Sequence, residues 1–356
     1  MPINRLYNIW FARVEQRWSH LRVTQKRNLT NLIVGVYLSK SVALSAIAMK
    51  IPSQAVQVSI QRRLSRTLEN SAIRVRECYD PEITPLLAEI SKKGVVRILL
   101  DGSKIGNNHQ LLMVSVAYRR RSIPVVWTWL KSPRGHSSSR KQLALLLHLR
   151  KLLPDDAKVL LLGDSEFGAV DVIRQVEKWQ WHYVLRQKSN HLVQLASGDW
   201  KAFGDFIQKA GESLWLGKGL LTQKHACPAN LLAHWRKGED IPWLLATNLN
   251  TRKETIRGYK VRMWIEEMFG DMKGHGFDLE STRLRDFRKL SRLTFIVALL
   301  YVWLIAFGSK IIKAGLRRLV DRNERRDLSV FQIGLRSIER RLTNQDKLSI
   351  SFQIYL

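Results

Sequence analysis

The spacing of hydrophobic residues predicts helices in the first quarter of the chain. Within 4–21 the apolar side chains recur every three or four positions, at Leu6, Ile9, Trp10, Val14 and Trp18. A second helix is predicted over 24–40, with Thr24 as its N-cap. A short helix follows, Pro52 breaks the pattern, and Ser53 is placed to cap a longer helix.

The pattern changes to that of strands after residue 90. The run VVRILLDGSKI is apolar and β-branched up to Asp101, and two more strands are predicted within 109–132, joined by a basic turn at Arg119–Arg121. A helix, a second buried strand that ends at Asp164, another helix and another strand follow. This order, with the first three strands antiparallel, predicts an α/β fold with a ribonuclease-H-like core, a mixed sheet flanked by helices.

The rest of the chain predicts three further features. Residues 189–243 lose regular periodicity and carry short strand-like pieces among their tryptophans, which predicts a β-rich insertion. The apolar stretch Leu293–Gly308 is shorter than the roughly 20 residues that span a bilayer, so a buried core helix is expected. We therefore divide the chain into a helical N-terminal domain at 1–85, an α/β domain at 90–310 that contains the insertion, and a basic C-terminal region at 311–356.

The segment Tyr259–Lys273 is predicted to be an amphipathic helix with two adjacent glutamates. At about 100° per residue, one narrow polar stripe contains Tyr259, Arg262, Glu266 and Lys273. Glu267 falls outside this stripe, beside Lys260. The opposite side carries the residues expected to face a core: Val261, Trp264, Ile265, Met268 and Met272. The alternative interpretation is a solvated helix face whose charges pair along the helix.

The charge of the chain predicts a polyanionic partner. Lys plus Arg number 59 against 30 Asp plus Glu, which gives a net charge of +29. Nucleic acid is the first candidate and an anionic membrane surface the second. Arg62, Arg63 and Arg66 lie on the last helix before residue 80, which suits a DNA-binding domain; the alternative is a helical packing or dimerisation module. The two cysteines match neither a disulfide framework nor a zinc site, which fits a reducing cytosol.

Three carboxylates come from separate predicted elements. Asp101 and Asp164 each end an apolar strand, where open α/β sheets place their sites, and Glu266 lies on the polar stripe of the helix. Together they suit two divalent ions, Mg²⁺ or Mn²⁺, about 4 Å apart, on either side of a phosphodiester. Glu166 competes with Asp164 for the second position. Taken one at a time, each of these residues is typical of a loop-capping aspartate or a surface glutamate.

These residues resemble those of a DDE transposase of the insertion-sequence-four type. That family carries the signature Y-x2-R-x3-E-x6-K, which Tyr259, Arg262, Glu266 and Lys273 match without a gap. Its first aspartate follows an apolar strand, as in ILLDGSKI, and its second begins a D-x-x-F/Y turn, as in LLGDSEFG. A β-rich insertion before the catalytic helix is a further likeness. The resemblance covers roughly 90–310.

The resemblance implies a bacterial cut-and-paste transposase whose metal ligands are Asp101, Asp164 and Glu266. It implies recognition of terminal inverted repeats, a hairpin at the cleaved end, and strand transfer into target DNA. Phosphates would be held by Tyr259, Arg262 and Lys273. A flipped base would stack on Trp235 or Trp243. The expected form is a homodimer in a synaptic complex, in the cytoplasm and associated with the nucleoid.

Three other functions fit parts of the same pattern. A metal-dependent nuclease or resolvase on the same fold would cut DNA without joining it, since the metal chemistry is shared. An inactive remnant would bind DNA and use the fold only as a scaffold. A membrane-surface protein would use Leu293–Gly308 and the basic charge. The presence of all three carboxylates favours the enzyme over the remnant.

Overall fold

The N-terminal region is helical, as its periodicity predicts. A computed structural model describes residues 2–106, 109–131, 136–196, 198–322 and 324–355. The first five helices are α1 (Pro2–Arg17), α2 (Val23–Ser39), α3 (Leu44–Ala48), α4 (Gln57–Glu69) and α5 (Val75–Ser91). Two predicted caps are wrong by a few residues, because α2 is capped by Arg22 rather than Thr24, and α4 begins after Val56 rather than Ser53.

Helix α5 forms although it contains Pro81 and Pro85, and the sequence did not predict it. A proline cannot donate to the carbonyl four residues before it, so Pro85 leaves the Pro81 carbonyl without its helical donor. The Arg17 side chain donates to that carbonyl at 3.3 Å. Arg17 and Arg13 of α1 also pair with the buried Glu82 carboxylate. Contacts from α1 therefore offset part of the cost of the prolines.

Ten strands of the described residues form one mixed sheet in the order β3-β2-β1-β4-β5-β10-β9-β8-β6-β7. The strands are β1 (Val96–Ile105), β2 (His109–Tyr118), β3 (Arg121–Lys131), β4 (Val159–Gly163), β5 (His182–Arg186), β6 (Leu192–Leu195), β7 (Lys201–Ala202), β8 (Ser213–Leu221), β9 (Cys227–His234) and β10 (Trp243–Thr247). The strands β1 to β3 are antiparallel, and β4 and β5 run parallel to β1. The predicted mixed sheet is thus confirmed.

The β-rich insertion continues the sheet instead of forming a separate unit. Strand β10 pairs antiparallel with β5 and with β9, so the insertion strands extend the same hydrogen-bonded ladder. At the other end of the sheet, β2 and β3 are joined by a two-residue hairpin. Its residues Arg119 and Arg120 have φ of 46° and 61°, the left-handed backbone that tight hairpins require. The predicted basic turn is therefore one residue shorter, and Arg121 begins β3.

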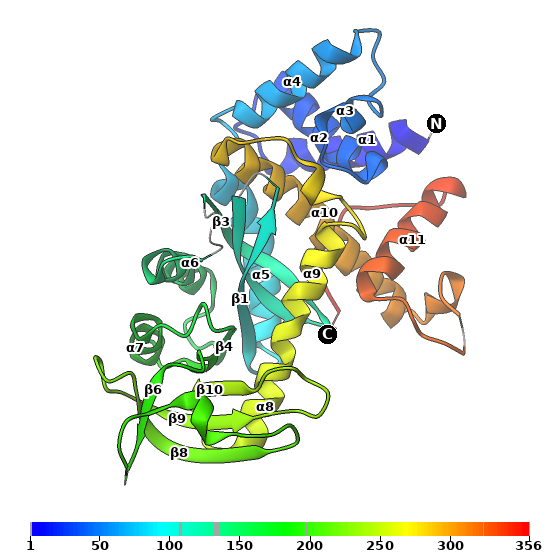
Figure 1. Cartoon of the computed structure of the whole chain (residues 1–356). Coiled ribbons are helices and arrows are strands. Elements are labelled where there is room, and N and C mark those ends of the chain that lie inside the picture. Colours follow the sequence, from blue (N-terminus) through cyan, green and yellow to red (C-terminus); the bar gives the residue numbers. More distant parts are fainter. Residues whose placement is uncertain (1, 107–108, 132–135, 197, 323, 356) are drawn as a thin grey trace.

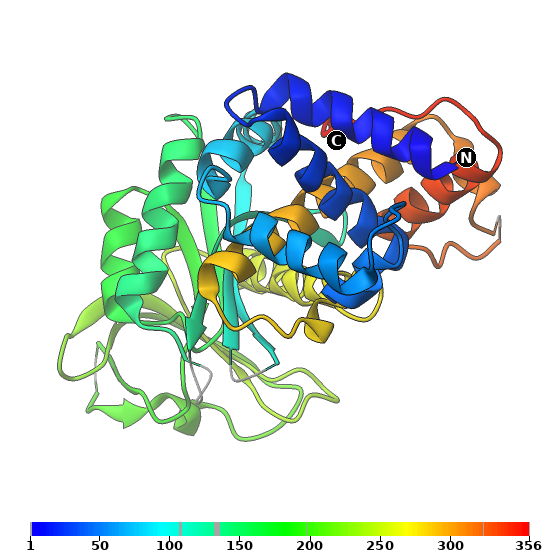
Figure 2. The ribbon, with the colours of Figure 1, turned by 90° about the horizontal axis from the view of Figure 1, so that it is seen from above.

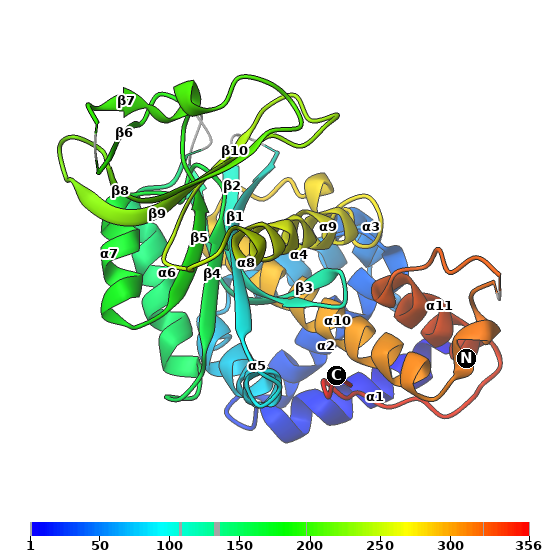
Figure 3. The same ribbon diagram turned by 90° about the horizontal axis from the view of Figure 1, so that it is seen from below.

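Helices cover both faces of the sheet (Figure 3). On one face lie α6 (Ser139–Leu152) and α7 (Val170–Lys178). On the other run α8 (Arg252–Lys260), α9 (Trp264–Met272) and α10 (Phe287–Lys313). Short 3₁₀ turns are η1 (Phe203–Phe206), η2 (Val261–Met263), η3 (Leu279–Ser281) and η4 (Leu316–Leu319). Figures 1 and 2 show the N-terminal helices over α10, away from the insertion strands.

Helix α10 is the central helix of the core. By length and composition it is apolar enough to cross a membrane, but 89% of its most apolar window is buried inside the protein. Every residue of Leu293–Gly308 is buried in the protein interior, as expected for a core helix.

The basic C-terminal region packs back onto the core. Helix α11 (Val330–Thr343) crosses α10 at two glycines: a Cβ on Gly334 would lie 2.0 Å from the Leu304 carbonyl oxygen, and one on Gly308 2.0 Å from that of Val330. Beyond α11 the chain passes along α1, and the Tyr118 hydroxyl donates to the Tyr355 carbonyl at 2.6 Å.

Candidate active site

The two aspartates come together through the pairing of β1 with β4. These strands are parallel, and Leu100 pairs with Gly163. The next residues on the two strands are Asp101 and Asp164, so the two positions lie side by side. Asp164 directly follows β4, as predicted. The prediction for Asp101 needs a correction, because β1 continues to Ile105 and Asp101 lies inside the strand, where it pairs with Met113 of β2. Its carboxylate is therefore carried by a rigid element.

The pKa of the Asp101 carboxyl group is shifted by the groups around it. Burial, then the neighbouring Asp164 carboxylate, raise the pKa of Asp101 to about 7, and Glu266 adds to the rise. The Arg262 guanidinium and the Gly102 amide, which donates to Asp101 Oδ1 at 2.7 Å, act in the opposite direction. Like charges held together away from water favour a bound cation, which agrees with the metal site expected from the sequence.

The signature helix is interrupted near its middle. It runs as α8, the 3₁₀ turn η2 and then α9, and Thr251 caps its start by accepting from the Glu254 amide. Arg262 lies in the 3₁₀ turn and Glu266 on the first turn of α9. Arg262 Nη2 is 2.6 Å from Glu266 Oε1, and its Nη1 is 3.5 Å from Asp101 Oδ2. One guanidinium thus bridges the first and third predicted carboxylates.

Oxygen ligands of this kind fit a hard divalent cation. Mg²⁺ is commonly held by one or two carboxylates together with waters and substrate phosphates. Asp101 and Asp164 offer such a pair. Among the described residues, no three His, Cys, Asp or Glu side chains form a ready ligand cluster. Glu266 instead points to Arg262, and its side chain is 45% exposed. The ligand roles of the three carboxylates stay predictions.

The other two signature residues, Tyr259 and Lys273, have different surroundings. Tyr259 is 2% exposed and packs edge-on against Trp243, with ring centroids 4.9 Å apart. Lys273 directly follows α9 as its C-cap; its Nζ pairs with Glu280 at 2.8 Å and donates to the Lys104 carbonyl at 3.1 Å. The Arg262 guanidinium lies over the Tyr259 ring, 5.8 Å from its centroid, so these two residues are neighbours as the stripe predicts, although Tyr259 is buried. Lys273 faces Glu280 and the end of β1, and its place on the stripe stays a prediction.

Glu267 lies outside the site, as the helical pattern predicts, but its partner differs. It pairs with Arg121 at 2.9 Å and not with Lys260. Arg121 also binds the buried Asp271 at 2.7 Å. Burial, opposed by Arg121, raises the pKa of Asp271 to about 6. This network fixes the far side of α9 to β3, which sequence spacing could not reveal because Arg121 and Asp271 lie 150 positions apart.

The remaining candidates lie at different places. Trp243 contacts Tyr259 and thereby adjoins the signature, whereas Trp235 donates to the Glu239 carbonyl at 2.8 Å within its own loop. Arg62, Arg63 and Arg66 lie on α4, which meets the start of α10 where Lys289 Nζ donates to Ser65 Oγ at 3.1 Å. The structure therefore brings Trp243 to the signature and places the three arginines beside α10.

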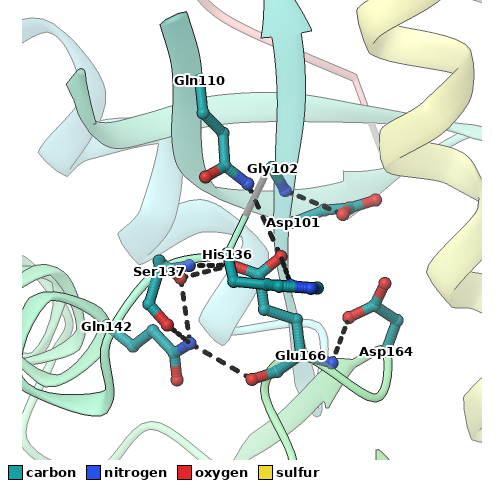
Figure 4. Close-up of polar contacts among 8 residues, drawn as sticks. All are labelled: Asp101, Gly102, Gln110, His136, Ser137, Gln142, Asp164 and Glu166. Carbon is teal, nitrogen blue, oxygen red and sulfur yellow. Dashed lines mark hydrogen bonds and ion pairs between the residues drawn. The ribbon is translucent and has the colours of Figure 1, made fainter. Parts of the chain in front are cut away.

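Glu166, the competing carboxylate, lies close to Asp164. Its amide donates to Asp164 Oδ1 at 2.8 Å, and its side chain accepts from Ser137 (Figure 4). Sequence reasoning missed Ser137 and Gln110, two side chains that meet it. No local pattern marks them, because they lie 29 and 56 positions from Glu166.

Comparison with known proteins gives the family. A family model described as the transposase DDE domain matches residues 99–303, more than half of the chain. Among solved structures, the chain is similar to a piggyBac transposase in a synaptic complex with hairpin DNA, at 10% identity and a TM-score of 0.47, with 96% of this chain and 77% of that chain covered.

A second solved structure is more distant. Marinitoga piezophila Argonaute in complex with guide RNA and target DNA matches at 10% identity and a TM-score of 0.25, with 70% of this chain and 37% of that chain covered. A search of curated proteins found no match. The family match contains Asp101, Asp164 and Glu266, and the chain belongs to the family of the transposase DDE domain.

Proposed function

We propose that this DNA transposase is a cut-and-paste enzyme of the insertion-sequence-four type. It would recognise terminal inverted repeats, excise the element and join it to target DNA. The observation that carries the proposal is that Arg262 lies between Asp101 of β1 and Glu266 of α9, while Asp164 follows β4 beside Asp101. The signature Y-x2-R-x3-E-x6-K supplies two of these four residues at the family's spacing.

The strand order supports the ribonuclease-H-like part of the proposal. The five strands β3-β2-β1-β4-β5 form an antiparallel meander followed by two strands parallel to β1. In this arrangement Asp101 of β1 and the end of β4 share one edge of the parallel strands, where α/β sheets place their sites. We propose the domain bounds 1–85, 90–310 and 311–356 with this core at their centre.

Divalent ions complete the proposed site. Bound Mg²⁺ or Mn²⁺, two ions in all, would supply charge stabilisation to the cleaved phosphodiester. Asp101 and Asp164 would hold the ions from the sheet. Glu266 would join them once Arg262 turns from it to a DNA phosphate, a partner that suits the forked guanidinium. The ion pair between Arg262 and Glu266 then keeps the third ligand in place while DNA is absent.

A hairpin end requires a distorted base step, and Trp243 is the better of the two tryptophan candidates. It contacts Tyr259 directly, and Tyr259 lies under the Arg262 guanidinium, 5.8 Å from the ring centroid. A base turned out of the stack beside the cleaved phosphate would therefore meet Trp243. Trp235 has no such link to the signature among the described contacts.

A basic surface at the start of α10 is the proposed path for DNA. Arg62, Arg63 and Arg66 of α4 form no ion pair with another described residue. A cavity of about 430 Å³ at the start of α10 has four arginines among its lining residues, Arg74, Arg76, Arg288 and Arg292. Phosphates bind such surfaces without reading sequence. We expect a homodimer in the synaptic complex, associated with the bacterial nucleoid in the cytoplasm.

The decisive test is incubation of the purified protein with its own element ends, Mg²⁺ and a target plasmid. We expect excised ends that migrate as hairpins on a denaturing gel, followed by joined products. Asp101→Asn and Asp164→Asn should each abolish cleavage while DNA binding persists, because a missing ligand leaves the ions unheld. Cutting without joining would favour the nuclease or resolvase, and binding without cutting would favour the inactive remnant.

A further inference from the structure

We propose that Glu166 is a positioning residue that sets where Asp164 lies relative to Asp101. The inference rests on the proposed function, since it concerns the metal site of that reaction. Glu166 lies two positions after Asp164, in the turn between β4 and α7. Its side chain is 12% exposed and points back toward the sheet, as Figure 4 shows.

Ser137 holds the carboxylate from one side. Its amide and its hydroxyl both donate to Glu166 Oε1, at 2.6 Å and 2.5 Å. Hydrogen bonds to an ionised acceptor are about twice as strong as those between neutral groups, so this double contact is a firm anchor. His136, the residue before it, brings its Nδ1 to 3.8 Å from Glu166 Oε2.

Gln142 of α6 completes the anchor. Its side-chain amide donates to Ser137 Oγ at 3.0 Å and to the Glu166 backbone carbonyl at 3.3 Å. Gln142 is 1% exposed, so its amide cannot swing into water. The turn that carries Asp164 is therefore tied to the first turn of α6 through both the side chain and the backbone of Glu166.

Glu166 contacts Asp164 directly and contacts the strand of Asp101 through Gln110. The Glu166 amide donates to Asp164 Oδ1 at 2.8 Å, which orients that carboxylate directly. On the other side, Gln110 Nε2 lies 3.5 Å from Glu166 Oε2. Gln110 covers Gly102, the residue next to Asp101, so closely that a Cβ there would be 2.3 Å from Nε2. Contacts thus run without a break from the strand of Asp101 to the turn of Asp164.

A carboxylate is the side chain that suits this position. Both of its oxygens face donors, Ser137 on one and Gln110 on the other. A glutamine would remove the negative charge and present an amide nitrogen on one side, which weakens the hold of these donors on the turn. Residues that orient metal ligands in this way typically change metal affinity about 10–100-fold when they are replaced.

The test uses two variants and a matched control. Glu166→Gln keeps the size of the side chain, Ser137→Ala removes only the hydroxyl donor, and Ser139→Ala removes a nearby hydroxyl that contacts Asp171 at 3.2 Å. Mn²⁺ binding to the DNA-free protein is measured from the EPR signal of unbound Mn²⁺, beside thermal melting and cleavage. We expect Mn²⁺ affinity to fall about 10–100-fold in Glu166→Gln. It should fall less in Ser137→Ala, where the amide donor remains, and stay unchanged in Ser139→Ala.

Two results would overturn the inference. Wild-type Mn²⁺ affinity in both variants would mean that Glu166 does not position the site. If Glu166→Gln loses Mn²⁺ binding while Ser137→Ala keeps wild-type Mn²⁺ affinity, Glu166 is a direct ligand and not a positioning residue. If Glu166→Gln fails to fold, Ser137→Ala decides alone, with its melting temperature as the check. A wild-type protein that binds Mn²⁺ but neither cuts nor joins its own ends would refute the proposed function and leave this comparison intact.

Discussion

At the scale of single residues, two adjacent glutamates have different surroundings. Glu266 faces Arg262 and, through it, Asp101, while Glu267 faces Arg121 on the other side of the helix. Helical geometry explains the separation, because neighbours along a helix point about 100° apart. Glu267 is 56% exposed and shares Arg121 with the buried Asp271, so its replacement leaves Arg121 still paired.

The two glutamates should therefore respond differently to the same substitution. Glu266→Gln removes a charge that the proposed metal site requires, so cleavage of a pre-nicked transposon end should be abolished while DNA binding is kept. Glu267→Gln should cost only roughly 0.2–1 kcal/mol of stability, the worth of an exposed ion pair, and should keep cleavage. Both are measured side by side in one gel assay. If Glu266→Gln still cleaves and Glu267→Gln does not, the match to the family signature is refuted.

At the scale of elements, the C-terminal helix is fixed to the core by close approach. Gly334 of α11 and Gly308 of α10 face each other's backbones, with no room for a methyl group on either. The buried side chains Phe331, Ile338 and Leu342 of α11 then reach the core. Small residues at the crossing thus decide how far the apolar face of α11 is buried.

Gly334→Ala should separate α10 from α11. The added methyl group would lie 2.0 Å from the Leu304 carbonyl oxygen, so one backbone must shift, and overpacking of this kind costs about 1–3 kcal/mol or more. Urea unfolding should show a lower midpoint. Gly198→Ala is the control, because a Cβ there meets nothing within 4 Å and should stay within about 0.5 kcal/mol of the wild type. Equal stability of the two variants would disprove the tight crossing.

At the scale of the whole molecule, the excess of positive charge is the dominant property. The net charge of +29 includes arginines on α4 beside the start of α10. Each phosphate neutralised by such a residue releases counterions, which makes DNA affinity depend on salt. A cavity lined in part by Arg74, Arg76, Arg288 and Arg292 adds further positive charge at the start of α10.

DNA affinity should fall steeply and linearly on a log–log plot against salt concentration. Replacing Arg62, Arg63 and Arg66 by alanine should flatten that slope by about 0.9 for each phosphate that these arginines neutralise in the wild type. The control triple variant replaces three exposed basic residues of α6, Arg140, Lys141 and Lys151, and should change the slope less. Fluorescence anisotropy with a labelled duplex measures the DNA affinity of the wild type and of both triple variants at each salt concentration. A flat response in the wild type would mean that the basic surface does not meet phosphate.

Several features of this protein could be predicted because they are local. Helices and strands follow from periodicities of 3.6 and 2, which involve residues a few positions apart. The mixed sheet, the buried helix at Leu293–Gly308 and membership of the DDE transposases were inferred from such patterns, and the structure and the family match confirm them. The spacing of the signature likewise singled out Arg262 and Glu266, which do form a pair.

Other features were decided only by tertiary structure. By contrast, the sequence by itself determined only which residue types the site contains and the net positive charge of the chain around it. The pairing of Leu100 with Gly163 decided that Asp101 and Asp164 are neighbours, and long-range contacts decided the partners of Lys273, Arg121 and Glu166. They also allowed α5 to form despite its prolines, through Arg17. The physical reason is distance along the chain: local propensity acts over a few residues, whereas these contacts join groups 29 to 169 positions apart.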